Sequence, residues 1–132
     1  MKTILILDDE SGVRQSLFDY FEDHLWNPIM AESAEDALLL IEKEKPVAAI
    51  VDVRLPGMNG SDFIREAVSR NIFMVFVICS GSSEYEFPQD LKSMACVCDD
   101  FFKKPVQDLV TLENQLSSMI QSCDVSPGQQ DD

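Results

Sequence analysis

The chain has 132 residues, of which 45% are hydrophobic and 26% charged, a composition typical of one soluble globular domain. Its formal net charge of −14 repels phosphate groups, which argues against direct binding to nucleic acid or to an anionic membrane. No apolar run approaches the roughly 20 residues that span a bilayer, and the first run is too short for a signal peptide. The four cysteines lack a CxxC or zinc-ligand spacing, so we expect reduced thiols and a cytoplasmic location.

Short apolar runs alternate with amphipathic segments five times along the chain. The apolar runs predict buried strands at residues 4–7, 28–31, 47–51, 73–79 and 96–102. Apolar residues at helical spacing predict helices over residues 11–25, from the candidate cap Ser33 to no further than Lys45, after a cap at Asn59 or Ser61, within 88–95, and from Pro105 onward. With right-handed crossovers, this alternation predicts an α/β three-layer sandwich around a five-stranded parallel sheet.

Two stretches lack a regular pattern. In the segment Ser82–Ala95, only residues 88–95 have a helix-forming composition, because Tyr85 and Phe87 stand before a proline. We therefore expect a fourth helix that is short, late or mobile. From Gln121 onward the sequence has no periodicity and few apolar residues to bury, so we expect one domain over 1–120 and a disordered tail or linker over 121–132.

Polar groups follow four of the predicted strands, at the point where each strand ends. They are Asp8 and Asp9, then Asp52, Ser80 and Lys104. Ligands of open α/β sheets bind at the carboxyl edge of the strands, where all five side chains would meet. The three carboxylates would repel one another and raise at least one pKa, and a bound Mg²⁺ would remove that cost. The added hydroxyl and amine complete the groups needed for in-line phosphoryl transfer to a carboxylate.

Together these motifs resemble the receiver domain of two-component response regulators, which is CheY-like, over roughly residues 2–120. The matching elements are Asp8-Asp9, Asp52 within VDVRLPGMNG, Ser80-Gly81 and the run DDFFKKP that ends at Pro105. The resemblance implies a flavodoxin-like sheet with the strand order 2-1-3-4-5. It also implies a phosphoacceptor in signal transduction that only phosphorylates and dephosphorylates itself and is not otherwise an enzyme.

The resemblance assigns roles to the acidic residues. Asp52 is implied to be the phosphoacceptor, which forms an aspartyl phosphate. Asp9 is implied to bind Mg²⁺ directly and Asp8 through water, with Asp52 and the backbone carbonyl of Arg54 as further ligands. Mn²⁺ is expected to substitute for Mg²⁺.

The remaining site residues are implied to sense the phosphoryl group. Ser80 and Lys104 would contact its oxygens, and Phe101 would be the aromatic residue that changes rotamer on activation. The peptide bond before Pro105 is implied to be cis. The chain departs from the family pattern at Val97-Cys98, where receivers usually carry Gly-Ala, and Phe101 lacks the hydroxyl of the tyrosine that is frequent there.

The implied partners are a sensor histidine kinase or phosphotransfer protein and an unknown output protein, with a phosphorylation-dependent homodimer as a further option. One alternative is the receiver half of a longer regulator with a phosphatase or adaptor output. A haloacid-dehalogenase-type phosphatase would need an acid where Arg54 stands. A flavodoxin-like electron carrier would need a Ser/Thr/Gly-rich phosphate loop after Leu7, and none follows it.

Overall fold

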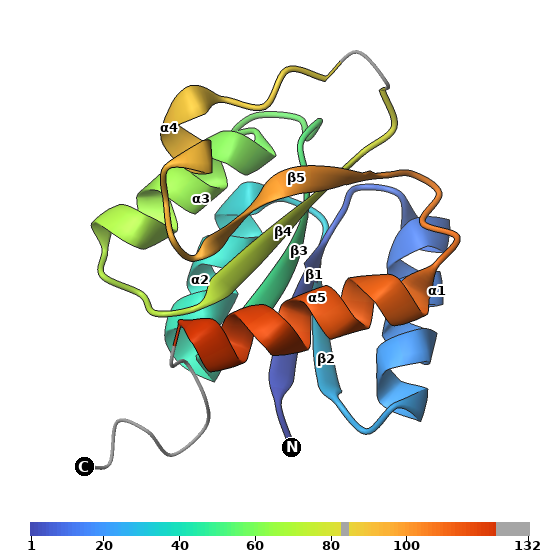
Figure 1. Cartoon of the computed structure of the whole chain (residues 1–132). Coiled ribbons are helices and arrows are strands. Elements are labelled where there is room, and N and C mark those ends of the chain that lie inside the picture. The colour runs from blue at the N-terminus through green and yellow to red at the C-terminus, as the bar shows by residue number, and fades with distance from the viewer. Residues whose placement is uncertain (83–84, 124–132) are drawn as a thin grey trace, which may run out of the picture.

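The computed structural model describes residues 1–82 and 85–123, and within them five strands alternate with five helices (Figure 1). The strands are β1 (Thr3–Leu7), β2 (Asn27–Ala31), β3 (Ala48–Asp52), β4 (Val75–Ser80) and β5 (Val97–Lys103). The helices are α1 (Ser11–Asp23), α2 (Ala34–Glu44), α3 (Gly60–Ser69), α4 (Gln89–Lys92) and α5 (Leu109–Ser122). All strands are parallel in the order β2-β1-β3-β4-β5, which confirms the predicted fold.

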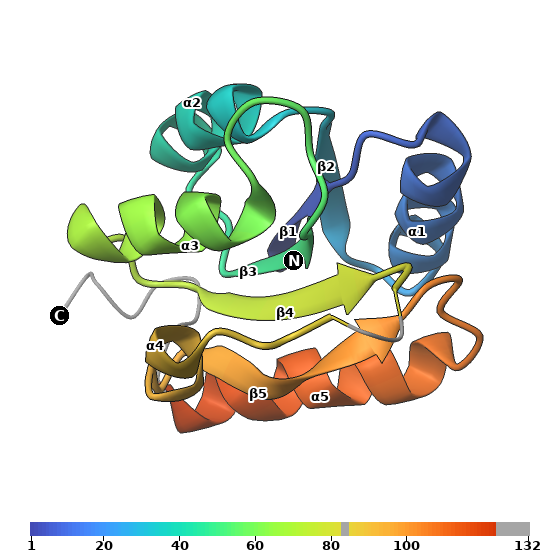
Figure 2. The ribbon, with the colours of Figure 1, turned by 90° about the horizontal axis from the view of Figure 1, so that it is seen from above.

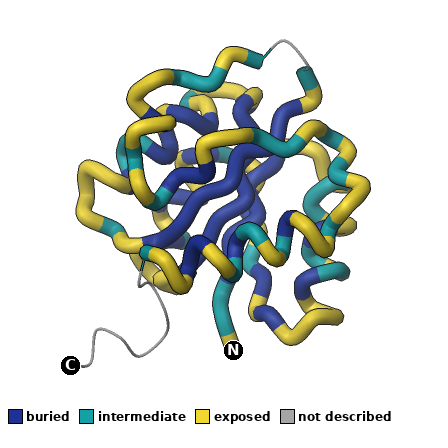
Figure 3. Tube along the Cα trace, in the orientation of Figure 1, coloured by how far each residue is buried: buried dark blue, intermediate teal, exposed yellow. Residues whose placement is uncertain are grey.

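The sheet lies between two layers of helices. Helices α2, α3 and α4 cover one face, and α1 and α5 cover the other (Figure 2). Strand side chains alternate between these layers, so Leu5 and Leu7 belong to the first core while Ile4 and Ile6 belong to the second. The central strands are buried along their length (Figure 3). Among the described helices, none is both long enough and apolar enough to cross a membrane.

Side-chain caps fix the start of two helices where the sequence predicts them. The Ser33 hydroxyl accepts a hydrogen bond from the Asp36 amide at 3.1 Å, at the start of α2. The Asn59 side chain accepts one from the Asp62 amide at 2.8 Å, at the start of α3. Each cap satisfies a backbone N–H that has no partner within the first helical turn. Helix α4 has only four residues, which confirms the expected short helix.

The predicted start of the last helix is wrong. Helix α5 begins at Leu109 rather than at Pro105, because Asp108 caps it by accepting a hydrogen bond from the Thr111 amide at 3.0 Å. The Lys104–Pro105 peptide bond is cis, as the resemblance implied. At its other end α5 continues past residue 120 into the expected tail, and residues 124–132 of that tail lie outside the described residues.

Two further element boundaries differ from the predicted ones. Strand β4 begins at Val75 and not at Phe73, whose side chain is 78% exposed. Helix α1 ends at Asp23 and not at Leu25, which adopts a left-handed φ of 66°. The other strands lie within one residue of their predicted ranges.

Strands β4 and β5 pair with an irregular register. Phe76 lies opposite Val97, whereas Ile78, two residues on, lies opposite Phe101, four residues after Val97. Strand β5 therefore holds two extra residues at this point, among them the exposed Asp99. Phe101 and Val97 nonetheless pack in the same core, the one that α2, α3 and α4 share with the sheet.

Glu113 joins the two helices of the second layer. Its carboxylate accepts a hydrogen bond from the Tyr20 hydroxyl at 2.7 Å and another from the Trp26 indole N–H at 2.9 Å. Burial, and then the bond to Glu113, raise the pKa of Tyr20 to about 12. This carboxylate therefore ties the end of α1 and the start of β2 to α5.

Candidate functional site

Polar side chains gather at the carboxyl edge of the sheet, as the alternation of elements predicts. Asp52 and Ser80 are the last residues of β3 and β4, while Asp8 and Lys104 directly follow β1 and β5. The register places Ser80 beside Lys103, so the ends of neighbouring strands lie level with each other. Asp8, Asp52 and Ser80 are each no more than 3% exposed, although they are polar.

The ammonium group of Lys104 holds this edge together. Its Nζ lies 3.0 Å from Asp8 Oδ2, 2.9 Å from Glu10 Oε1 and 3.4 Å from Asp52 Oδ2. The side chains of Lys104, Asp8 and Asp52 are buried, whereas that of Glu10 is 62% exposed. One buried cation is thus shared among three carboxylates.

The electrostatics follow from burial and from this imbalance of charge. Burial first, and then the charge of Asp8, raise the pKa of Asp52 to about 6, against the opposing effect of Lys104. Burial alone would lower the pKa of Lys104, but its hydrogen bonds to Glu10 and Asp8 outweigh this effect and raise it. Burial and the charge of Asp8 also raise the pKa of the Cys79 thiol to about 12. Asp52 therefore sits where a further cation would be favourable.

The oxygen ligands needed for a hard cation are present. One carboxylate oxygen from each of Asp8, Asp9 and Glu10 lies within 4.8 Å of the others, and an all-oxygen donor set fits Mg²⁺. Asp52 is outside this group but is linked to Asp8 through the shared ammonium. The Arg54 amide donates to Asp52 Oδ1 at 3.4 Å, which places the Arg54 backbone beside the same carboxylate.

Two further predicted residues, Ser80 and Phe101, have other partners than Lys104 and its carboxylates. The Ser80 hydroxyl accepts a hydrogen bond from the Ser82 amide at 3.2 Å and donates one to the Ser82 carbonyl at 3.4 Å. Phe101 is half-buried, and its ring meets the Tyr85 ring edge-on with 5.1 Å between centroids. The structure therefore brings together Asp8, Asp52 and Lys104, with Ser80 and Phe101 on the adjacent strands.

Two charged residues at the site were not predicted. Glu10 shares the ammonium of Lys104, and the Arg14 guanidinium donates to the backbone carbonyl of Asp8 at 2.8 Å. Glu10 directly follows the acidic pair, and its charge was the only sequence signal for this role. Arg14 lies one turn into α1, and the helical spacing places it on the outward face of that helix, so the pattern gave no signal for its contact with the end of β1.

Gly60 supports the site through its backbone. A Cβ at this position would meet the backbone carbonyl of Asp52 and would lie 2.8 Å from Val51 Cγ1. Both neighbours belong to the central strand β3, so neither can move without disturbing the sheet. The first turn of α3 therefore packs directly against the backbone of Asp52 only because residue 60 lacks a side chain.

We expect Gly60→Ala to lower the free energy of unfolding by about 1–3 kcal/mol, because the added methyl group overpacks a site that cannot relax. Urea unfolding of both proteins would measure this loss. Gly12→Ala is the matched control, since Gly12 is helical and a Cβ there would have no neighbour within 4 Å. That variant should be more stable than the wild type by roughly 0.5–1 kcal/mol, and equal losses for both variants would contradict the assignment.

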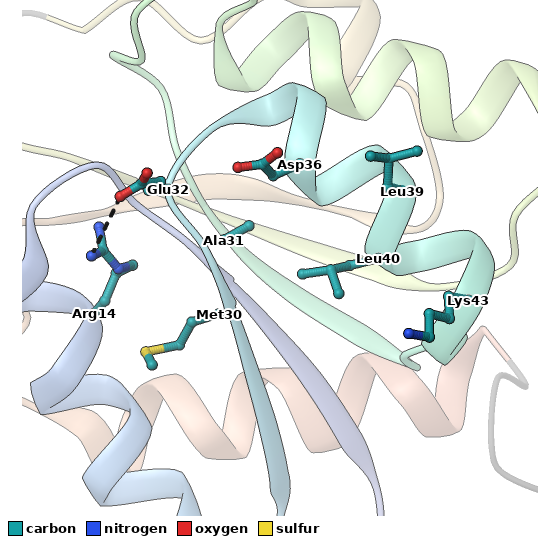
Figure 4. A pocket seen from close by; sticks show the side chains of 8 residues that line it. All are labelled: Arg14, Met30, Ala31, Glu32, Asp36, Leu39, Leu40 and Lys43. Atoms are coloured by element: carbon teal, nitrogen blue, oxygen red, sulfur yellow. Dashed lines mark ion pairs between the residues drawn. The ribbon is translucent and has the colours of Figure 1, made fainter.

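A separate groove with a volume of about 600 Å³ lies between α1 and α2, over the edge strand β2 (Figure 4). Its lining consists of Arg14, Met30, Ala31, Glu32, Asp36, Leu39, Leu40 and Lys43. Among the lining residues, Arg14 Nη2 and Glu32 Oε2 form an ion pair with 3.9 Å between them. None of the predicted site residues lines this groove, but Arg14 belongs to its lining and also donates to the backbone carbonyl of Asp8, so the groove adjoins the carboxyl-edge site.

Comparison with known proteins agrees with this geometry. Residues 4–117 match the model of the response regulator receiver domain family. A cyclic di-GMP phosphodiesterase from Thermotoga maritima is 33% identical over 104 residues, which are 79% of this chain and 27% of that protein. Sporulation initiation phosphotransferase F from Bacillus subtilis is 28% identical over 104 residues, which are 77% of this chain and 81% of that protein.

A solved structure shares the fold. The response regulator protein TrrA from Thermotoga maritima, in complex with Mg²⁺-BeF, has a TM-score of 0.76 and 24% identity, with 90% of this chain and 99% of that chain covered. The chain spans about a quarter of the length of the phosphodiesterase but most of the length of the phosphotransferase. The family match covers most of the chain and includes all four strand ends that carry the polar residues. The chain belongs to the response regulator receiver domain family.

Proposed function

We propose that this domain accepts a phosphoryl group on Asp52 from a sensor histidine kinase or a phosphotransfer protein. The aspartyl phosphate then changes how the domain interacts with an output protein. The observation that carries this proposal is the position of the Lys104 ammonium, which lies 3.0 Å from Asp8 and 3.4 Å from Asp52 at the carboxyl edge of the sheet. The likeness to a named phosphotransferase along most of its length supports it.

The transfer is an in-line displacement at phosphorus. A carboxylate oxygen of Asp52 attacks, the bond from phosphorus to the donor's leaving group breaks, and an acyl phosphate forms. The incoming group adds negative charge beside Asp8, and the ammonium of Lys104 offsets part of it. We propose that the Ser80 hydroxyl leaves the Ser82 backbone and donates to a phosphoryl oxygen.

The domain is proposed to use Mg²⁺, which Mn²⁺ can replace. Asp9 would hold the ion directly and Asp8 through water, together with Asp52 and the backbone carbonyl of Arg54. When bound, the ion supplies positive charge that neutralises the carboxylates and the phosphoryl oxygens. The Mg²⁺-BeF complex of the relative TrrA supports this choice of ion. Glu10 offers a further carboxylate oxygen beside those of Asp8 and Asp9.

The domain is proposed to act as a switch and to process no external substrate. A second candidate is the receiver half of a longer regulator, because the chain matches only 27% of the length of the phosphodiesterase relative. In that case the output would be a phosphatase or adaptor segment of the same polypeptide.

Recovery of partners with wild-type protein, with and without beryllofluoride, would separate an independent output protein from a phosphorylation-dependent homodimer.

Incubation with acetyl phosphate and Mg²⁺ tests the proposal. We expect intact-mass measurement to show one added phosphoryl group, which hydroxylamine removes because it is an acyl phosphate. Peptide mapping should place this group on Asp52. The variant Asp52→Ala should remain unmodified, and an undiminished adduct on that variant would refute the proposal.

The metal requirement is tested in the same assay. A chelator should abolish the adduct, and so should the variant Asp9→Ala. Because the Asp9 side chain is exposed, we expect this variant to fold like the wild type. Glu22→Ala, on the exposed surface of α1, serves as a control that should be phosphorylated like the wild type. Equal phosphorylation with and without the chelator would rule out the metal.

A further inference from the structure

Tyr85 packs against the predicted switch residue. It lies in the connection between β4 and α4, and its ring meets the Phe101 ring edge-on at 5.1 Å and 84°. The Phe87 ring lies 6.1 Å from Tyr85 on the same connection. All three rings pack against the core between the sheet and helices α2, α3 and α4. Because α4 is only four residues long, these aromatic side chains supply part of the cover of this core.

The hydroxyl of Tyr85 is buried and has no hydrogen-bond partner. Among the described residues it is the one buried side-chain oxygen or nitrogen in this condition. The other tyrosine of the chain, Tyr20, shows the usual arrangement, with its hydroxyl 2.7 Å from the Glu113 carboxylate. A buried hydroxyl that has lost its water without gaining a partner raises the free energy of the conformation that buries it.

The contact between the two rings links this penalty to the position of Phe101. Phe101 lies opposite Ile78, two residues before Ser80, on the strand next to the one that carries the hydroxyl of the switch. If Phe101 rotates toward Ser80, its ring leaves the edge-on contact with the Tyr85 ring. Tyr85 then moves as well, and its hydroxyl reaches water or a new partner.

We infer that Tyr85 is a positioning residue of the switch, which acts through Phe101 and destabilises the resting conformation relative to the phosphorylated one. The inference rests on the proposed function. A phosphoryl group shifts the two populations only by its differential interaction with them. The unsatisfied hydroxyl of Tyr85 raises the free energy of the resting conformation. The phosphoryl group therefore has to supply less free energy to favour the phosphorylated conformation.

The experiment compares Tyr85→Phe with the matched control Tyr20→Phe, since each variant loses one hydroxyl and keeps its ring. Two quantities are measured: the midpoint of thermal unfolding without any phosphoryl mimic, and the affinity for beryllofluoride in the presence of Mg²⁺. Tyr85→Phe should unfold at a higher temperature and bind beryllofluoride roughly fivefold or more weakly. Tyr20→Phe should unfold at a lower temperature and bind it as tightly as the wild type.

A double-mutant cycle tests whether Tyr85 acts through Phe101. In the background of Phe101→Ala, Tyr85→Phe should no longer change the affinity for beryllofluoride. Unchanged affinity for the single variant Tyr85→Phe, whatever its unfolding temperature, would overturn the inference, and so would a lower unfolding temperature. If the wild type itself fails to bind beryllofluoride, the proposed function falls together with the inference, and this outcome is distinct from the others.

Discussion

Replacing Lys104 with alanine is expected to lower the free energy of unfolding at pH 7 by about 3 kcal/mol and to slow phosphorylation roughly 100-fold or more. The ammonium lies within 3.4 Å of carboxylate oxygens of Glu10, Asp8 and Asp52. Without it, the buried Asp8 and Asp52 keep their mutual repulsion and lose the charge that offsets it. The transferring phosphoryl group loses the same cation.

Urea unfolding with and without Mg²⁺, together with the acetyl phosphate assay, would measure both effects. We expect Mg²⁺ to restore part of the stability, because a dication can take over the neutralisation of the carboxylates. The neighbouring exposed residue supplies the control variant, Lys103→Ala, which removes the same charge from the end of β5. If the two variants lost equal stability, the buried ammonium would have no special role.

Asp52→Asn is expected to be more stable than the wild type at pH 7, by between about 1 and 3 kcal/mol. Burial and the charge of Asp8 raise the pKa of Asp52 from 3.8 to about 6 in the folded protein. The folded state therefore holds this proton more tightly than the unfolded state does. The contribution of Asp52 to stability is fully present below pH 3.8 and is lost as the pH rises to about 6.

The asparagine variant has no such proton, so its advantage over the wild type should appear between those two pH values and remain constant above them. Urea unfolding from pH 4 to pH 8 would follow the difference. Asp19→Asn is the control, since Asp19 is exposed on α1 and asparagine can still accept the hydrogen bond that the Gln15 side-chain amide donates to Asp19. The explanation fails if the Asp52 variant has the same advantage at both ends of the range.

Much of the fold followed from periodicity, whereas element starts depended on contacts that a single sequence does not display. Phe73 is apolar and extends the run of β4 in the sequence. In the structure the first β3–β4 pair is Ala48 with Val75, so Phe73 precedes the ladder and its side chain is exposed. Similarly, Pro105 suits the first turn of a helix, but the cap that starts α5 is Asp108. At both element starts, strand pairing or helix capping outweighed the conformational preference of the local sequence.

Some residues of the site could likewise be predicted from the sequence, whereas others could not. Asp8, Asp52 and Lys104 were predictable because the ends of parallel strands meet at one edge, whatever the details of packing. Glu10 was not, because its role depends on how far the Lys104 side chain reaches. Gly60 was not predictable either, since its role depends on how closely the first turn of α3 returns to the backbone carbonyl of Asp52, which the sequence pattern does not show. The strand order itself came from the family resemblance and not from the pattern.

The irregular register between β4 and β5 limits how the length of this chain can vary. Because β5 gains two residues over β4 between Phe76 and Ile78, the odd-numbered Phe101 still faces the same core as Val97, while Phe102 faces the opposite one. Loss or gain of a single residue here would exchange the two phenylalanines between the cores and turn every later side chain of the strand over. Length changes between Val97 and Lys104 are therefore compatible with this pairing only in even steps, and natural variation within this strand should obey that parity.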